Sequence, residues 1–211
     1  MRCYSWNVNG IRAVARKELL PWKQLPRADV FCLQETKAHI EQLDPEVAEP
    51  KGWHAYYSTT QRKGYSGVAI ISRKEPDEVI EGLGVRKLDQ EGRVLRARYG
   101  DLLVISAYFP KSQPEGPRFE YKLDFCRGMR RFLKKQVDSG LNILLMGDYN
   151  IAHEPIDLAR PKQNLQNPGF LPEERSWMSR YLKSGFHDVF RERNPDLEGA
   201  YSWWSYRFGV R

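Results

Sequence analysis

Short apolar runs of four to six residues recur along this 211-residue chain, separated by turn-forming residues. Runs of this length are typical of β-strands and are too short for most helices. They lie at residues 3–6, 30–33, 68–71, 94–98, 102–107 and 143–146. Segments 93–99 and 102–108 flank a Gly100-Asp101 turn, which predicts a β-hairpin. The spacing of these runs therefore predicts a sheet-rich fold.

Two longer stretches have the period of a helix instead. One of these helices is expected from Pro172 to Gly185, because Pro is favoured in the first turn of a helix and Gly just past its last turn. Residues 19–25 and 40–47 predict shorter helices. Strands mixed with helices predict an α/β fold, a layered sandwich of two mainly antiparallel or mixed sheets flanked by helices. The other long helix lies earlier in the chain and is expected because six residues fall on one apolar face: Phe119, Leu123, Cys126, Met129, Leu133 and Val137.

The composition favours one globular domain over residues 1–211. Hydrophobic residues make up 41% of the chain, enough for a sizeable core, and no repeat or long linker divides it. Cys3, Cys32 and Cys126 are odd in number and far apart, so we expect reduced core thiols and no disulfide framework. The chain begins without an apolar leader and has no run of about 18 apolar residues, so we expect a cytoplasmic protein that does not bind membranes.

The charge of the chain points to an anionic partner. The formal net charge is +7 and the pI is about 9.3, which favours a nucleic acid over a membrane surface. Because the 34 Lys and Arg residues are spread along the sequence, this indication is weak.

Polar residues follow four of the apolar runs. Strand ends in layered sheets often carry active-site loops, so these groups are expected to converge on one cleft. Singly, each has an ordinary structural explanation as a turn cap, a surface charge or a strand end. Together they are the oxygen ligands, amides and phenol that magnesium-assisted phosphoryl cleavage needs, and zinc is disfavoured because Cys and His clusters are missing. The residues are Asn7 and Asn9, Glu35, Tyr108, and Asp148 with Asn150.

Five motifs closely resemble the exonuclease III family of apurinic/apyrimidinic endonucleases. They are residues 6–12 (WNVNGIR), 33–37 (LQETK), 64–69 (GYSGVA), 107–110 (AYFP) and 147–150 (GDYN). Each alone is weak and is shared with other magnesium phosphodiesterases, but their order and spacing match along essentially the whole chain. Residues 155–175 are similar to the DNA-gripping region of the nuclease branch, although a polar surface loop leading into a helix would have the same composition.

The resemblance implies a role for each residue at the centre of the site. Glu35, assisted by Asn9, would hold Mg²⁺, with Mn²⁺ as a possible replacement. Asp148 would orient or deprotonate the attacking water, and Asn7 and Asn150 would position the water and the phosphate. Tyr108 would support the charged transition state or the leaving group.

The resemblance also implies contacts with double-stranded DNA that carries abasic or 3′-blocked sites. The protein is expected to act as a monomer. Trp203 would line the pocket for the extruded abasic sugar, and for Trp204 a place in the core is an equal alternative. The residues expected to contact DNA are Arg12, Lys37, Lys111, Asn164, Asn167 and Trp203.

Two departures from the family pattern stand out. The family continues into Gly-Trp-Arg-Xaa-Asp and Gly-Ser-Asp-His segments that supply an Asp–His pair and a further carboxylate, and these segments are absent here. We therefore expect a shortened form of a longer enzyme that lacks its final strands. Lys111 stands where many members have Asn, and it would meet a phosphate as a point charge.

Three functions follow from these patterns. The leading one is a DNA repair nuclease that cleaves 5′ to abasic sites and has 3′–5′ exonuclease and 3′-phosphodiesterase activity. The second is a hydrolase of small phosphoesters, which residues 155–175 argue against. The third is a DNA-binding relative without catalysis, which salt-sensitive binding without metal-dependent nicking would identify.

Overall fold

The computed structural model describes residues 1–113 and 116–203, and its tertiary contacts group the chain into two compact units. The sheet unit comprises Met1–Pro110 and Asp124–Tyr149, and the helical unit comprises Lys111–Leu123 and Asn150–Arg211. That residues 1–211 form a single domain stays a prediction, and Trp204 lies outside the described residues.

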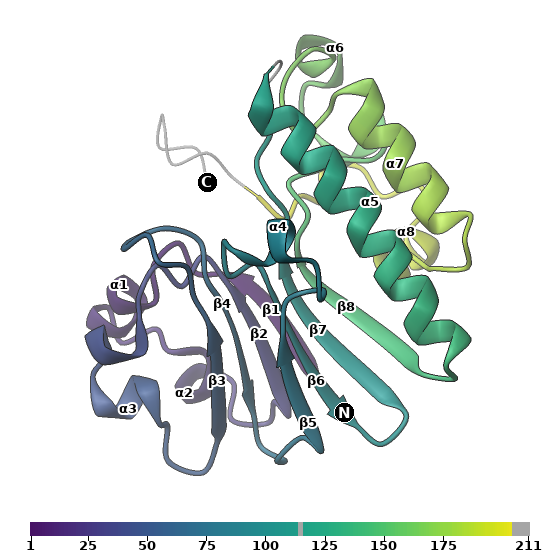
Figure 1. The fold of residues 1–211 in the computed structure, drawn as a ribbon. Helices are drawn as coiled ribbons and strands as arrows, with labels where there is room; N and C mark the ends of the chain where they lie inside the picture. The colour runs from purple at the N-terminus through teal and green to yellow at the C-terminus, as the bar shows by residue number, and fades with distance from the viewer. Residues whose placement is uncertain (114–115, 204–211) are drawn as a thin grey trace. The chain divides into compact units, whose positions relative to one another are not determined.

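The sheet unit contains two sheets, each with four strands among the described residues (Figure 1). The first has the order β1-β2-β4-β3, and the second has the order β5-β6-β7-β8. In both sheets one strand pair is parallel, β1 with β2 and β7 with β8, and the other pairs are antiparallel. The predicted class, two mixed sheets flanked by helices, is confirmed. The strands are β1 (Cys3–Asn7), β2 (Val30–Gln34), β3 (His54–Ser58), β4 (Val68–Ser72), β5 (Glu78–Glu81), β6 (Val94–Tyr99), β7 (Leu102–Tyr108) and β8 (Asn142–Asp148).

Strand β2 explains why a short run without polar residues forms a strand here. Side chains alternate across a sheet, so Phe31 and Leu33 pack on one face and Val30 and Cys32 on the other. The first pair joins a core with helices α1 (Ile11–Arg16), α2 (Pro21–Gln24) and α3 (Pro45–Ala48). The second pair packs against residues of β6 and β7, between the two sheets. Both faces are buried, so the strand needs no polar side.

The strands that the sequence pattern missed lie at sheet edges. Strands β3 and β5 end the two sheets and have polar or exposed positions, so neither contains a continuous apolar run. The six predicted strands are all present, and β6 pairs with β7 as the predicted hairpin. Edge position alone does not explain this difference, because β1 and β8 also end the sheets and were predicted from their apolar runs.

The short predicted helices are partly wrong. Residues 40–47 form a 3₁₀ turn, η1 (Ile40–Gln42), and then α3, because Pro45 has no N–H and begins a new helix instead of continuing one. Within residues 19–25, the helix is limited to α2, Pro21–Gln24. The sequence pattern gave no signal for α1 or for α4 (Arg86–Asp89).

The long predicted helix is α5 (Pro117–Asp138), and its bounds extend the expected range slightly. Its buried face includes Phe125, Cys126, Met129 and Leu133, whereas Val137 is 48% exposed and was wrongly assigned to that face. Lys122, three residues before Phe125, is fully buried although it is charged. The helical period thus identified the helix, but it did not identify which polar side chain shares the buried face.

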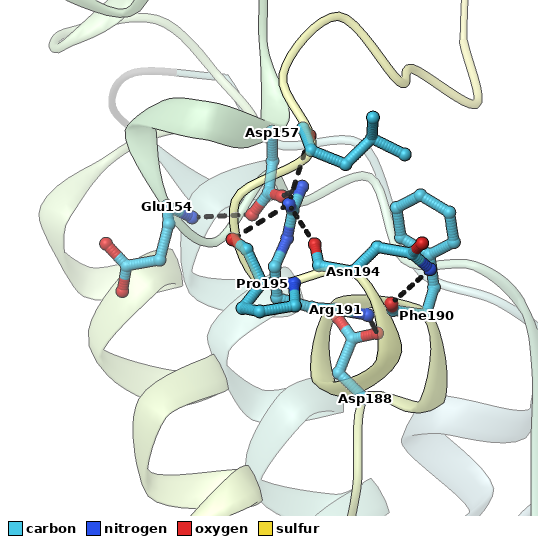
Figure 2. Close-up of polar contacts among 8 residues, drawn as sticks. Glu154, Asp157, Asp188, Phe190, Arg191, Asn194 and Pro195 are labelled. Atoms are coloured by element: carbon cyan, nitrogen blue, oxygen red, sulfur yellow. Dashed lines mark hydrogen bonds and ion pairs between the residues drawn. The ribbon is translucent and has the colours of Figure 1, made fainter.

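The helical unit contains, besides the start of α5, η2 (Pro155–Asp157), α6 (Pro161–Asn164), α7 (Pro172–Leu182) and α8 (Val189–Arg193). The predicted second helix is α7, which ends at Leu182. Arg191 of α8 organises one part of this unit (Figure 2). Its guanidinium donates to Asp157 at 2.7 Å and to the carbonyls of Asn194, Pro195 and Leu197 at 2.9–3.3 Å. One side chain thus joins η2 to the turn that follows α8.

Two expectations from composition concern cysteines and membranes. Cys32 and Cys126 are buried and Cys3 is partly buried, and all three are free thiols. In the described part of the chain, no helix is both long and apolar enough to cross a membrane.

The two-sided burial of β2 makes a prediction about stability. Leu33→Ala should lower the free energy of unfolding by about 2–5 kcal/mol, because Leu33 is fully buried and the truncation leaves a cavity. Leu19→Ala removes the same atoms at a position that is 46% exposed, so it should cost less than about 0.5 kcal/mol. Urea denaturation of both variants measures this difference. Equal losses would contradict the assignment of the core.

Candidate active site

Four strand ends of the sheet unit bring polar side chains together. Asn7 ends β1, Glu35 directly follows β2, and Tyr108 and Asp148 end β7 and β8. The parallel registers align these ends, because Asn7 lies opposite Gln34 and Tyr108 lies opposite Asp148. The structure therefore gathers these four residues, as the sequence pattern predicted, and their individual roles stay predictions.

The side-chain amide of Asn7 joins carboxylates that belong to different sheets. Its Nδ2 donates one hydrogen bond to Glu35 Oε1 and another to Asp148 Oδ2, each 2.8 Å long. Its Oδ1 accepts from the backbone N–H of Asn9 at 3.0 Å, which fixes which end of the amide faces the acids. An amide group offers two N–H donors, and both are used here to hold two acidic groups side by side.

Gly147 lets Asp148 lie next to Tyr108. The two parallel strands approach so closely at this point that a Cβ atom on Gly147 would lie 1.9 Å from the carbonyl oxygen of Ala107. Any larger residue would force the ends of β7 and β8 apart. The Gly before Asp148 is therefore required by backbone packing.

The turn after β2 holds Glu35 in an unusual backbone conformation. Glu35 and Lys37 have φ values of 53° and 52°, in the left-handed region that non-glycine residues rarely adopt. Hydrogen bonds from Lys37 N to Ser66 O (2.9 Å) and from Thr36 N to Gly67 O (3.1 Å) hold this turn. A Cβ on Gly67 would lie 2.3 Å from the Thr36 hydroxyl, so the two turns pack tightly. Such local strain persists only where the surroundings enforce it.

A cation is held at the oxygens that the family resemblance assigns to a metal. The Lys37 ammonium lies 2.6 Å from Glu35 Oε2 and also donates to Asn9 Oδ1. Both side chains of the ion pair are partly accessible, Lys37 at 31% and Glu35 at 18%. Carboxylate and amide oxygens that surround a positive charge in this way fit a hard divalent cation.

No group of three or more His, Cys, Asp and Glu side chains suited to a metal occurs in residues 1–113 and 116–203. The carboxylate of Glu35 and the amide oxygen of Asn9 suit Mg²⁺, which commonly binds through one or two carboxylates and keeps several waters. Zinc in structural sites, by contrast, takes four protein ligands. The residues present therefore fit a magnesium-type ion held by Glu35 with the help of Asn9.

The surroundings of Glu35 keep it ionised. Burial alone would raise the pKa of its carboxyl group, but the hydrogen bonds from Asn7 and Lys37 and the charge of Lys37 outweigh burial, so the pKa is lowered. A group with a lowered pKa stabilises the fold above its unfolded pKa, and this contribution disappears as the pH falls through the folded pKa. Glu35 is therefore available as an anion at neutral pH.

Tyr108 has the opposite shift. Burial raises the pKa of its phenol most, the charges of Glu35 and Asp148 raise it further, and only Arg93 opposes them. The hydroxyl also hydrogen-bonds to the Glu35 carboxylate. Tyr108 therefore stays protonated at neutral pH and acts as a hydrogen-bond donor.

Arg93 is part of this site, and the sequence reasoning missed it. Its side chain is 1% exposed and lies with its guanidinium 4.7 Å from the ring centre of Tyr108. It donates to the Tyr108 carbonyl (3.1 Å), to the Tyr65 hydroxyl (2.8 Å) and to Glu91 (2.6 Å). The only sequence signal is an Arg beside an apolar strand in a Gly-Arg-Val context, which normally indicates a surface charge. Arg93 holds the strand end that carries Tyr108.

The residues expected to contact DNA divide between the units. Arg12 is exposed on α1 in the sheet unit, where Lys37 lies against Glu35. In the helical unit, Asn167 donates to Asn164 Oδ1 at 2.9 Å, so these two side chains lie together, while Lys111 is exposed. Trp203 is 67% exposed, which leaves its ring open to solvent. Asn150 also belongs to the helical unit, with φ 49° and its carbonyl bonded to Lys122.

The chain belongs to the endonuclease/exonuclease/phosphatase family, whose sequence model matches residues 4–211. The exodeoxyribonuclease of Bacillus subtilis is 43% identical over 212 residues, an alignment that spans the whole of this chain and 82% of that protein. The DNA repair nuclease APEX1 of Danio rerio is 38% identical, across the whole of this chain and 68% of that protein.

The fold matches solved structures of the same branch. An AP endonuclease from Archaeoglobus fulgidus superimposes with a TM-score of 0.85 and 31% identity, over 98% of this chain and 78% of that one. Within the family, the chain is thus placed with the exonuclease III and AP endonuclease proteins, as its motifs indicated.

The contact between Lys37 and Glu35 makes a prediction about metal affinity. Lys37→Gln should strengthen Mg²⁺ binding, because the ion then no longer has to displace an ammonium group from Glu35 and Asn9. A partly exposed ion pair contributes about 0.2–1 kcal/mol, so the Kd for Mg²⁺ should fall by up to about fivefold. Isothermal titration of the DNA-free protein measures this change. Lys17→Gln, an exposed site with the same charge change, is the control, and an unchanged or weaker affinity in Lys37→Gln would refute the competition.

Proposed function

We propose that this protein is a metal-dependent DNA repair nuclease that hydrolyses the phosphodiester on the 5′ side of an abasic site. The proposal includes 3′–5′ exonuclease and 3′-phosphodiesterase action at the same site. Mg²⁺ is the proposed metal, with Mn²⁺ able to replace it. A monomeric state and a cytoplasmic location complete the proposal.

The observation that carries this proposal is the bridge from Asn7 to Glu35 and Asp148. The bridge holds two acidic groups side by side. Glu35 lies against the Lys37 ammonium and the Tyr108 phenol, and Asp148 lies opposite Tyr108 in the paired strand. Metal-assisted hydrolysis needs these two roles, a carboxylate for the metal and a carboxylate for water, at adjacent positions. Relatives named as an exodeoxyribonuclease and as a DNA repair nuclease support DNA as the substrate.

Glu35 and Asn9 would hold the metal. When bound, the metal would neutralise charge on a non-bridging phosphate oxygen. Lys37, displaced from Glu35, would then be available for a neighbouring DNA phosphate, which is the role expected for it from the resemblance.

Asp148 accepts the proton of the attacking water. Its Oδ2 is held by Asn7, so the carboxylate has a fixed direction from which to orient the water. The water oxygen attacks phosphorus, the bond to the 3′ oxygen breaks, and that oxygen leaves as a 3′-hydroxyl after it takes a proton from solvent water. Alignment of the water opposite the leaving oxygen contributes as much as the charges do.

Tyr108 would donate its hydrogen bond to the phosphate while charge develops there, in place of the bond to Glu35. Its raised pKa keeps the proton on the phenol, and Arg93 supports the strand end and adds positive charge behind the ring. Fixed donors that face developing negative charge are often the largest single contribution to catalysis.

DNA would be held by residues other than the acidic pair. Asn164 and Asn167 would donate to phosphates, and the exposed indole of Trp203 would stack against an extruded sugar or base. Arg12 and Lys111 would add salt-sensitive contacts with the backbone.

The water-activating role predicts a specific loss in Asp148→Asn. The variant should reduce kcat by about 10²-fold or more, the contribution typical of a general base, because an amide cannot accept the proton. Its Kd for abasic duplex, measured by fluorescence anisotropy, should stay within about threefold of the wild-type value. Asp138→Asn, the same change at an exposed helical site, should leave kcat unchanged. A normal kcat in Asp148→Asn would remove this residue from the mechanism.

The function itself is tested by nicking of a labelled duplex that carries one abasic-site analogue, in Mg²⁺, in Mn²⁺ and in EDTA. The proposal predicts a metal-dependent product with a 3′-hydroxyl end on the 5′ side of the site. Salt-sensitive binding without cleavage would identify a non-catalytic DNA-binding protein. Cleavage of a small phosphodiester with intact DNA would identify a hydrolase of small phosphoesters.

A further inference from the structure

A buried ion pair lies in the helical unit, and none of the roles assigned above uses it. Lys122 Nζ lies 3.0 Å from Glu174 Oε1, and both side chains are 0% exposed. Two fully buried charges are costly, and an apolar pair of similar volume is often as stable or more so. The contacts that the pair makes with its surroundings therefore matter more than its own attraction.

Each charge is also bonded to the main chain of a predicted functional segment. Lys122 Nζ donates to the carbonyl of Asn150 at 2.6 Å. Glu174 Oε2 accepts from the backbone N–H groups of Gly169 at 2.7 Å and Leu171 at 3.1 Å. The ion pair thus connects the segment of Asn150 to the loop that follows Asn167.

The two segments also touch one another beside the ion pair. Ala152 N donates to Gly169 O at 2.7 Å, and a Cβ on Gly169 would lie 3.3 Å from the carbonyl oxygen of Asn150. Asn150 has φ 49°, a left-handed conformation that costs energy without support. Lys122 supplies that support at the carbonyl of the same residue.

The segment that Glu174 bonds to directly follows the predicted phosphate ligands Asn164 and Asn167. Phe170 N donates to Asn167 O at 3.0 Å, and Phe170 is buried with 2% exposure. Because Glu174 holds the N–H groups of the residues on either side of Phe170, it sets the path of the chain directly after Asn167.

We propose that Lys122 and Glu174 are positioning residues, which set the left-handed backbone of Asn150 and the loop of Asn164 and Asn167. This inference rests on the proposed function, because those three asparagines are the ones expected to position the phosphates. The ion pair acts through these segments and has no direct contact with substrate.

The experiment uses the paired variant Lys122→Met/Glu174→Gln. Lys122→Met alone would leave a buried carboxylate without its cation, so that variant can fail to fold. The paired variant removes both charges, and the Gln carbonyl can still accept from Gly169 and Leu171. Circular dichroism and thermal unfolding check that the paired variant folds. Lys134→Met/Asp138→Asn, on the exposed face of α5, is the matched control and should keep wild-type kcat.

The expected result is a drop in kcat on abasic duplex of about 10- to 100-fold, since a small displacement of an aligned group costs this much. KM for DNA should stay within about threefold, because the contacts of the loop with residue 174 are retained. In an Asn150→Ala background the same paired change should have little further effect on kcat. If the ion pair only stabilises the fold, the paired variant should have the wild-type kcat under conditions in which it is fully folded. That outcome would overturn the proposal.

A second readout does not need the enzyme to act on DNA. Hydrogen exchange at the Ala152 amide, which bonds to Gly169 O, should become at least about tenfold faster in the paired variant, while α7 stays protected. Unchanged exchange at Ala152 would refute positioning by the pair. If wild-type protein fails to nick abasic DNA, the proposed function fails, and hydrogen exchange still decides this inference.

Discussion

The candidate active site depends on one side chain, the amide of Asn7, which donates to Glu35 in one direction and to Asp148 in the other. Glu35 follows a strand of the first sheet and Asp148 ends a strand of the second, so this amide joins the two layers where their strands end. Two carboxylates side by side would repel each other without donors between them. Gly147 and the turn around Thr36 bring the carboxylates within reach of Asn7. A larger residue at 147 would meet the Ala107 carbonyl oxygen, and one at 67 would meet the Thr36 hydroxyl.

The fold could largely be predicted from the sequence because the central strands are buried on both faces. Strands such as β2 and β4 begin with an apolar run of four residues, a length that favours a strand over a helix. Strands β3 and β5 escaped prediction because neither contains an apolar run of four residues. The prediction of one helix over residues 40–47 was wrong, because Pro45 can begin a helix but does not continue one.

The candidate site could be predicted where function requires a residue type at a strand end, as for Glu35 and Asp148. Residues that act by supporting others could not. Arg93 and Lys122 look like surface charges in the sequence, and both are buried beside partners from distant segments, Tyr65 for Arg93 and Glu174 for Lys122. The contact of Lys37 with Glu35 was also beyond the sequence reasoning, because it depends on the left-handed turn that bends Lys37 back. Such partners are fixed by tertiary structure and leave no local periodicity.

The central claim is that Asn7 and Asp148 act as one unit in hydrolysis. The most direct measurement is a double-mutant cycle on kcat for abasic duplex at saturating Mg²⁺, with Asn7→Ala, Asp148→Asn and the double variant. The account predicts strong non-additivity, with the double variant about as slow as the slower single variant, because Asn7 acts on the water through Asp148. Losses that multiply in the double variant would show that the two residues act independently and would contradict the account.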